Sequence, residues 1–301
     1  MLIGTRHCAA LPLVPGALPV GHNSPDTVET TGTAERFGFQ TICEVPAGYA
    51  ASWAVRATSG QSFRTRILRD PAQVTGILPP EGEVWLALAV PDDSMREMLS
   101  ALSDEEAERI ARFRHAPDRW SFFSAHGLLR SYMAAMLDCA PQDLRFSGEG
   151  KAGKPLLDPE FAARQPELEF NMSHTRGFVA AAFASSPIGV DVERVCPIPE
   201  MRDLIADLMH PVALSAFDAE TDAGRQTALF FRYWTLSEAF LKATGEGLTE
   251  TTRDLAFNAT GTPRLRAAAG GDAPEIWHFG HVSDGCEDWL RAPTPNAAIG
   301  Q

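Results

Sequence analysis

Two carboxylates in the segment GVDVE (189–193) could hold a divalent metal ion. Asp191 and Glu193 are one residue apart, and side chains alternate between the faces of a β-strand, so both would point the same way. Neighbouring carboxylates repel, and oxygen-only ligands favour Mg²⁺, which takes further oxygens from phosphates. The alternative is a strand whose polar face meets water.

A third carboxylate and a lysine share one face of a long helix expected over residues 221–244. Trp234, Glu238 and Lys242 are spaced i, i+4, i+8. Glu238 could complete a metal site and Lys242 could bind a phosphate. The alternative is a surface Glu–Lys pair, worth about 0.2–0.5 kcal/mol. Gly245 and Gly247 then end the helix.

The segment FNMSH (170–174) adds a hydroxyl at Ser173 and, at His174, a donor whose charge can switch near neutral pH. Alone, such a histidine is more often structural, so its value depends on the other motifs.

The segment GEGKAGKP (148–155) superficially fits two nucleotide-binding patterns. Its glycines spell GxGxxG, but the prolines that follow prevent the required helix from starting. It also matches seven positions of a Walker A loop, with Pro155 where Ser or Thr must hold Mg²⁺. What remains is a turn carrying Lys151 and Lys154, either an anion-binding turn or an ordinary surface loop.

The elements that would position these residues form an α+β pattern. Strands are expected at 83–90, 144–147, 168–173, 178–184, 188–195, 254–258 and 276–282. A capping box at Ser103 and Glu106 starts one helix, Asp118 caps a longer one ending before Pro141, and further helices cover 200–209 and 212–219. We therefore expect two similar α+β halves, 83–187 and 188–290. Residues 1–82 are a poorly defined, disorder-prone extension, and 291–301 a frayed tail.

Composition excludes several classes of protein. The 301 residues carry a formal charge of −13, which disfavours nucleic acid as a partner. No apolar run reaches membrane-spanning length, and prolines interrupt the apolar start, so neither a membrane partner nor export is expected. Five scattered cysteines argue against a disulfide framework and for a cytoplasmic location. A monomer is the default expectation.

Taken in order, GKP, FNMSH, IGVDVE and WTLSEAFLKATGEGL resemble the surfactin-synthetase-type 4′-phosphopantetheinyl transferases of the holo-acyl-carrier-protein synthase superfamily, over about residues 83–258. The resemblance implies a pseudo-twofold pair of α+β subdomains with the active site at their junction. It also implies Mg²⁺-dependent transfer of phosphopantetheine from coenzyme A to a serine of an acyl or peptidyl carrier protein, which releases adenosine 3′,5′-bisphosphate.

The resemblance also implies roles for individual residues. Asp191, Glu193 and Glu238 match the metal ligands, and Glu238 would take the serine proton while Lys242 stabilises the leaving group. The matches to coenzyme A contacts are Lys154, Pro155, Ser173, His174, Lys242, Arg109, Arg112 and Arg119.

Two positions depart from the family pattern. Ser237 stands where lysine is usual, and Ser121 where arginine is common, although Arg119 could replace it. These losses of positive charge predict weaker coenzyme A binding, and they motivate an alternative: a degenerate homologue that binds coenzyme A or a carrier without transfer. A nucleotide hydrolase using Lys154 is a remote third option. The arginines expected to dock an acidic carrier, or to form a solvated helix face, are Arg109, Arg112, Arg114, Arg119 and Arg130.

Overall fold

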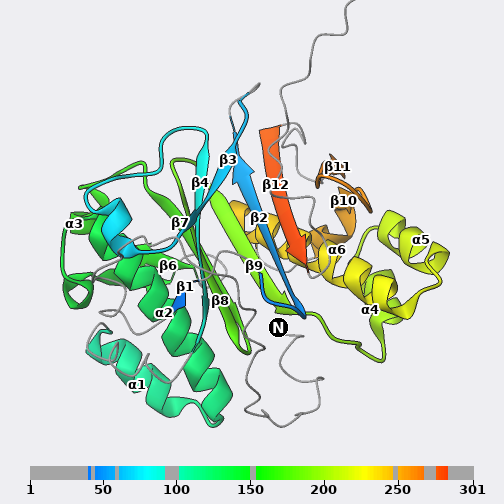
Figure 1. The fold of residues 1–301 in the computed structure, drawn as a ribbon, viewed down its shortest axis with the longest axis horizontal. Coiled ribbons are helices and arrows are strands. Elements are labelled where there is room, and N and C mark those ends of the chain that lie inside the picture. Colours follow the sequence, from blue (N-terminus) through cyan, green and yellow to red (C-terminus); the bar gives the residue numbers. More distant parts are fainter. Residues whose placement is uncertain are drawn as a thin grey trace, which may run out of the picture.

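The computed structural model describes residues 40–41, 45–57, 61–91, 102–149, 154–246, 250–267 and 276–283. They form a mixed α+β fold in which two β-sheets pack against each other and helices cover the outer face of each (Figure 1).

The first sheet is built on β4 (Glu83–Val90), β8 (Phe178–Ala184) and β7 (Glu169–Thr175), with β8 in the middle and all three antiparallel. On the other edge, β1 (Gln40–Thr41) pairs antiparallel and β3 (Arg64–Leu68) pairs parallel with β4. Helix α2 (Ala116–Met136) covers this sheet, and α1 (Asp104–Arg112) precedes it.

The second sheet is antiparallel and has β2 (Tyr49–Arg56) at its centre, between β9 (Ile188–Arg194) and β12 (Trp277–Ser283). Helix α6 (Ala223–Thr244) packs on β9 and β2. Helices α4 (Met201–Leu208) and α5 (Pro211–Ala219) lie between β9 and α6 in sequence.

Short elements complete the fold. Hairpin β5–β6 joins Phe146–Glu149 to Pro155–Leu157, and hairpin β10–β11 joins Ala256–Phe257 to Leu265–Ala267. The remaining short helices are η2 (Pro71–Val74), η4 (Pro141–Asp143), α3 (Pro159–Ala162) and η6 (Glu250–Asp254).

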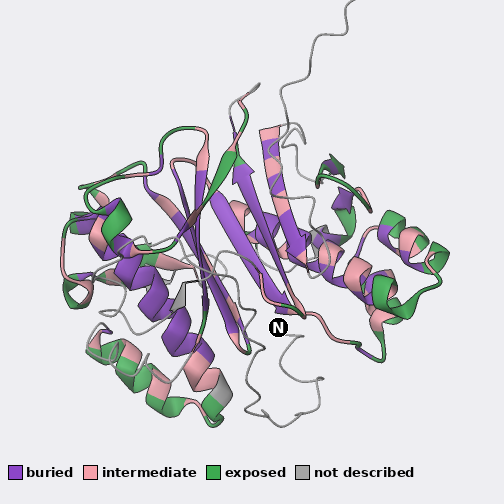
Figure 2. Cartoon of the chain, in the orientation of Figure 1, coloured by how far each residue is buried: buried purple, intermediate pink, exposed green. Residues whose placement is uncertain are grey.

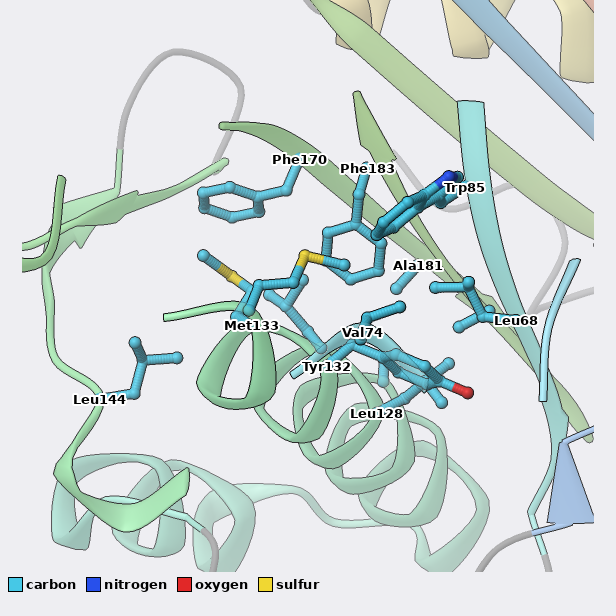
Figure 3. Packing of buried hydrophobic residues seen from close by; sticks show 14 of the residues in the cluster. Leu68, Val74, Trp85, Leu128, Tyr132, Met133, Leu144, Phe170, Ala181 and Phe183 are labelled. Carbon is cyan, nitrogen blue, oxygen red and sulfur yellow. The ribbon is translucent and has the colours of Figure 1, made fainter. Parts of the chain in front are cut away.

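The central strands are buried (Figure 2), and apolar side chains fill both of their faces. Between α2 and the first sheet, Leu128, Tyr132 and Met133 of the helix pack against Trp85 and Phe183 (Figure 3). The opposite face of β4 and β8 packs against β2 and β9, and α6 packs on the far side of β9. The central strands β2, β4 and β8 therefore each have a layer of apolar side chains on both faces.

Several sequence expectations need correction. Asp118 does not cap α2: the cap is His115, because Pro117 lies in the first helical turn, where its missing N–H costs nothing. Within residues 1–82, β2 and β3 are integral parts of the sheets. Cys196 is disulfide-bonded, whereas Cys139 is a free thiol.

In the described part of the chain, no helix is long and apolar enough to cross a membrane.

Candidate active site

Strand β9 presents two carboxylates on the face toward α6. Val190 and Val192 point into the core between the sheets, and the alternate residues Asp191 and Glu193 point the other way. Both carboxylates are nonetheless buried, at 4% and 8% exposure. Burying two acidic groups next to each other is unfavourable unless positive charge or hydrogen-bond donors compensate.

Asp191 lies at the centre of the polar contacts. Its Oδ1 accepts a hydrogen bond from Lys242 Nζ at 2.7 Å and from Ser173 Oγ at 3.0 Å. Its Oδ2 is buried and has no hydrogen-bond partner. A buried carboxylate oxygen left without a donor is costly, so this atom has an unused capacity to bind a cation.

Strand β7 reaches β9 through side chains, although the two strands belong to different sheets. Asn171 Oδ1 accepts from the Val190 amide at 3.2 Å. Ser173 Oγ accepts from the Val192 amide at 3.3 Å, and Thr175 Oγ1 donates to Glu193 Oε2 at 3.3 Å. Hydrogen bonds from alternate side chains of β7 thus take the place of backbone hydrogen bonds between β7 and β9, and they hold the carboxylates at the junction of the two sheets.

Helix α6 supplies Glu238 and Lys242. Its N-cap is Asp222, whose side chain accepts from the Arg225 amide, and Gly245 ends the helix in a left-handed conformation with φ of 74°. The three N–H groups of Lys242 are all used: besides Asp191, Nζ donates to Ser173 Oγ at 3.0 Å and to the Val190 carbonyl at 3.2 Å. One ammonium therefore ties α6 to both β7 and β9.

The pKa values reflect an excess of negative charge. Burial and the charge of Asp191 raise the pKa of Glu193 to about 8 and that of Glu238 to about 7. Burial acts to lower the pKa of Lys242, but Asp191 and Glu238 outweigh it and raise that pKa. Lys242 alone does not neutralise three carboxyl groups, so the site favours a further cation or protonation.

His174 points to the other side of β7 from Ser173. Burial, and then the charge of Lys242, lower the pKa of His174 to about 4, so it is neutral at pH 7. It can donate one hydrogen bond but does not add a positive charge.

In the residues described, no group of three His, Cys, Asp or Glu side chains is arranged to hold a metal ion as it stands. Asp191 is nevertheless close enough to raise the pKa of both Glu193 and Glu238, and Glu238 acts on Glu193 in the same direction. Carboxylate oxygens alone, with one of them unpaired, form the donor set that suits Mg²⁺.

The basic residues assigned to coenzyme A are held by other partners. Lys154 pairs with Glu169 at 3.0 Å, and Pro155 begins β6. Arg109 lies over the ring of Phe122, exposed Arg112 pairs with Glu108, and Arg119 donates to the Phe113 carbonyl. None of these contacts joins them to the carboxylates. Residues 150–153, with Lys151, and Gly247 lie outside the described residues.

One arginine of the expected docking cluster is structural. Arg130 is 1% exposed and donates to Glu106 at 2.7 Å and to the carbonyls of Pro141 and Leu144. It cannot contact a partner protein.

The strand that follows the GEGKAGKP segment, β6, also contradicts a dinucleotide fingerprint, which needs a helix there.

The two departures from the family pattern are both buried. Ser121 is 7% exposed and donates to the Thr175 carbonyl at 3.3 Å, and Ser237 is 4% exposed.

Sequence reasoning missed Asn171 and Thr175, although their spacing of two from Ser173 on a strand would have placed all three on one face.

Comparison with known proteins covers both parts of the chain. Residues 187–293 match a family model of the 4′-phosphopantetheinyl transferase superfamily, and residues 90–186 match a model of a 4′-phosphopantetheinyl transferase N-terminal region. The chain is 31% identical to the 4′-phosphopantetheinyl transferase HetI of Nostoc sp. over 204 residues, 67% of this chain and 84% of the relative. It is 29% identical to Sfp of Bacillus subtilis (55% and 70%). It is 27% identical to the mouse L-aminoadipate-semialdehyde dehydrogenase-phosphopantetheinyl transferase (54% of each).

Proposed function

Because this chain belongs to the 4′-phosphopantetheinyl transferase superfamily, we propose that its site moves 4′-phosphopantetheine from coenzyme A to a serine of an acyl or peptidyl carrier protein. The other product is adenosine 3′,5′-bisphosphate. The chain is a transferase, and the observation that carries the assignment to this site is Asp191, buried between Ser173 and Lys242 with one oxygen unpaired.

Asp191, Glu193 and Glu238 would hold Mg²⁺. The unpaired Asp191 Oδ2 and the raised pKa values of both glutamates support this assignment, because a divalent cation would supply the missing positive charge. When bound, the metal would neutralise charge on the pyrophosphate of coenzyme A.

Glu238 is the proton acceptor in this proposal. A pKa of about 7 leaves a large fraction of the carboxylate free to accept a proton at neutral pH. Glu238 is also only partly buried, whereas Glu193 is buried. A Glu238 carboxylate oxygen therefore takes the proton from the carrier serine as that serine attacks the phosphorus atom bonded to the pantetheine oxygen. The bond between this phosphorus and the bridging pyrophosphate oxygen breaks, and that oxygen leaves with adenosine 3′,5′-bisphosphate.

Lys242 has a role in orientation as well as in charge. All three of its N–H groups are engaged with Ser173, Asp191 and the Val190 carbonyl. To stabilise the leaving bisphosphate it must exchange one of these partners for a phosphate oxygen. Ser173 gives its single hydroxyl proton to Asp191, so it must also release that bond before it can donate to a substrate oxygen.

Coenzyme A would extend over the first half. His174 donates a hydrogen bond as a neutral imidazole, and Lys154 beside Pro155 contributes charge where β6 begins. The basic residues on and after α1 would contact the nucleotide phosphates: Arg109, Arg112 and Arg119, of which Arg119 would have to exchange the Phe113 carbonyl for a phosphate oxygen. Supporting this, Arg109 and Arg112 are exposed and belong to the last turn of α1.

We also assign the fold to a pseudo-twofold pair of halves. In the first half, the strand order β4, β8, β7 is covered by α2. In the second half, the strand order β9, β2, β12 is covered by α6. Both sets are antiparallel, and a short hairpin follows the long helix in each half. The active site then lies where the halves meet, at β7 and β9.

The direct test uses the full chain with Mg²⁺, coenzyme A and an apo acyl carrier protein. The carrier should gain the mass of one phosphopantetheine, and omission of Mg²⁺ should prevent the gain. If the protein binds coenzyme A but neither an acyl nor a peptidyl carrier gains mass, the chain is instead a homologue that only binds.

A further inference from the structure

A buried cluster of three polar side chains lies beside Asp191 in the second sheet and joins that sheet to α6. Ser52 Oγ is 2.7 Å from Thr235 Oγ1 and 2.8 Å from His281 Nδ1. Ser52 and Thr235 are fully buried, and His281 is 7% exposed. The roles described for the active site use none of them.

The protons of this cluster can be assigned. The Thr235 hydroxyl donates to the Phe231 carbonyl at 2.8 Å, so it must accept from Ser52. The single proton of Ser52 is then used, and Ser52 must accept from Nδ1–H of His281. An imidazole with its proton on Nδ1 provides this donor. Burial and the charge of Arg232 lower the pKa of His281 to about 3, so the ring is neutral. The three side chains satisfy one another.

The cluster is directly connected to the active-site elements. In the sheet, Ser52 pairs with Asp191 on one side and with His281 on the other, so all three lie in one row on the face toward α6. On the helix, Thr235 precedes Glu238 by three residues and Lys242 by seven, which places them along one helix face. The hydrogen bond from Ser52 to Thr235 therefore joins the row that carries Asp191 to the face that carries its partners.

The first half has an apolar counterpart at the same place. Strands β2 and β8 each follow a glycine with positive φ, Gly48 at 81° and Gly177 at 86°, and each begins with an aromatic residue. Counting from these glycines, Ser52 corresponds to Ala181. Ala181 pairs with Ala87 and Met172 and belongs to the apolar core under α2. A helix can thus pack on such a sheet without a polar row.

We propose that Ser52, Thr235 and His281 are positioning residues for the transfer reaction. They fix α6 along and around its axis, so that Glu238 and Lys242 face Asp191. Apolar contacts are not directional, whereas a hydrogen bond requires a defined distance and angle. The inference rests on the proposed function, because it concerns how the same site is assembled.

The test compares Ser52→Ala and Thr235→Val with a matched control, Thr227→Val. Thr227 lies on the same helix, is buried and makes the same intrahelical hydrogen bond, to the Ala223 carbonyl at 2.9 Å, but it is remote from the cluster. Two quantities are measured on folded protein: kcat/KM for carrier modification, and the affinity for Mg²⁺ alone by titration calorimetry.

We expect kcat/KM to fall about tenfold to a hundredfold in both cluster variants, because displacements near 1 Å are costly in an active site. The Mg²⁺ affinity of both cluster variants should also fall. Thr227→Val should match the wild type in both quantities. Thr235→Ser keeps the hydroxyl, so its kcat/KM and Mg²⁺ affinity should stay within about threefold of the wild type. Equal losses in Thr235→Val and Thr227→Val would overturn the proposal.

If Thr235→Val does not fold, Ser52→Ala against Thr235→Ser gives the same comparison, and unchanged Mg²⁺ affinity in Ser52→Ala refutes the positioning role. The two hypotheses fail separately. A wild-type protein that never modifies a carrier contradicts the proposed function, whereas an active wild type with unaffected cluster variants contradicts the positioning role alone.

Discussion

Gly189 on β9 lies against the backbone of α6 at Ala239. A Cβ atom at position 189 would be 2.0 Å from the Ala239 carbonyl oxygen and 2.6 Å from the Ala243 amide nitrogen. Real Cβ atoms do not approach backbone so closely, so only glycine permits this separation. Because Gly189 precedes Asp191 by two residues and Ala239 follows Glu238, this contact sets the distance between the acidic groups.

Gly189→Ala should therefore separate β9 from α6. The clash is with backbone, which cannot rotate away, so we expect a loss of about 3 kcal/mol in the free energy of unfolding and at least a tenfold loss of activity. Thermal unfolding and carrier modification measure the two effects. Gly224→Ala is the control, since its Cβ would meet only the side chain of Asp222, at 3.2 Å. A fully active Gly189→Ala would show that this distance is not critical.

Glu238→Gln should lose at least about a hundredfold in kcat while coenzyme A binding changes little. Bound Mg²⁺ would lower the pKa of Glu238 below its metal-free value of about 7, so the wild-type rate should increase with pH over a range that ends near 7, as the Glu238 carboxyl loses its proton. The variant has no such group, so its residual rate should lack this limb. Glu167→Gln, at an exposed position just before β7 with no role in the proposed reaction, is the control. An unchanged pH limb in Glu238→Gln would assign the proton acceptor elsewhere.

Mg²⁺ should stabilise the protein more at pH 8 than at pH 5.5. Glu193 and Glu238 have pKa values of about 8 and about 7 when folded, against about 4.3 in an unfolded chain. Between these values the folded state binds more protons, so stability without metal falls as pH rises. A bound cation removes that penalty. The shift in unfolding temperature on adding Mg²⁺, measured at both pH values, checks this prediction, and a shift independent of pH would argue against the carboxylate site.

Glu106 should make a large contribution to stability at neutral pH. Its carboxylate accepts from Arg130 Nε at 2.7 Å and contacts His126 Nδ1 at 2.8 Å. Burial alone would raise the pKa of Glu106, but the bond to His126 and the charge of Arg130 lower it to about 2. The contribution is therefore complete above about pH 4.5 and is lost as pH falls toward 2.

Glu106→Gln leaves Arg130 buried without its counter-charge, so we expect about 3 kcal/mol of destabilisation at pH 7. The difference from the wild type should shrink toward pH 2–3. Urea unfolding at several pH values measures it. Glu108→Gln on the same helix removes only an exposed pair with Arg112 and should cost less than about 0.5 kcal/mol. Equal effects of the two substitutions would show that burial of the Glu106 pair is unimportant.

The sequence predicted those parts of the fold that depend on local pattern. The apolar runs of β4 and β8 and the alternation of β9 mark their strands within a residue or so, and the capping box at Ser103 starts α1 as expected. Four motifs in a fixed order indicated the family, and the matches to family models confirm that assignment. The assigned roles of the individual site residues stay predictions.

What the sequence could not provide was non-local. The place of β2 depends on partners more than 130 residues away, and nothing in its own composition names them. Arg130 reads as a surface arginine on an amphipathic helix, but Glu106 and two carbonyl groups provide a buried site for it. The cluster of Ser52, Thr235 and His281 comes from three distant segments, so no spacing rule would have found it.

The position of β2 has a consequence for synthesis of the protein. Its pairing partners, Ile188–Arg194 and Trp277–Ser283, leave the ribosome long after it does, so β2 must wait unpaired until β9 has been made, and its other edge must wait for β12. Separate expression of 83–187 and 188–290 would leave a gap in the middle of the second sheet. A working split protein would need residues 45–57 attached to the later fragment, and the adjacent ends at Ala50 and Ser283 offer a natural point at which to join them.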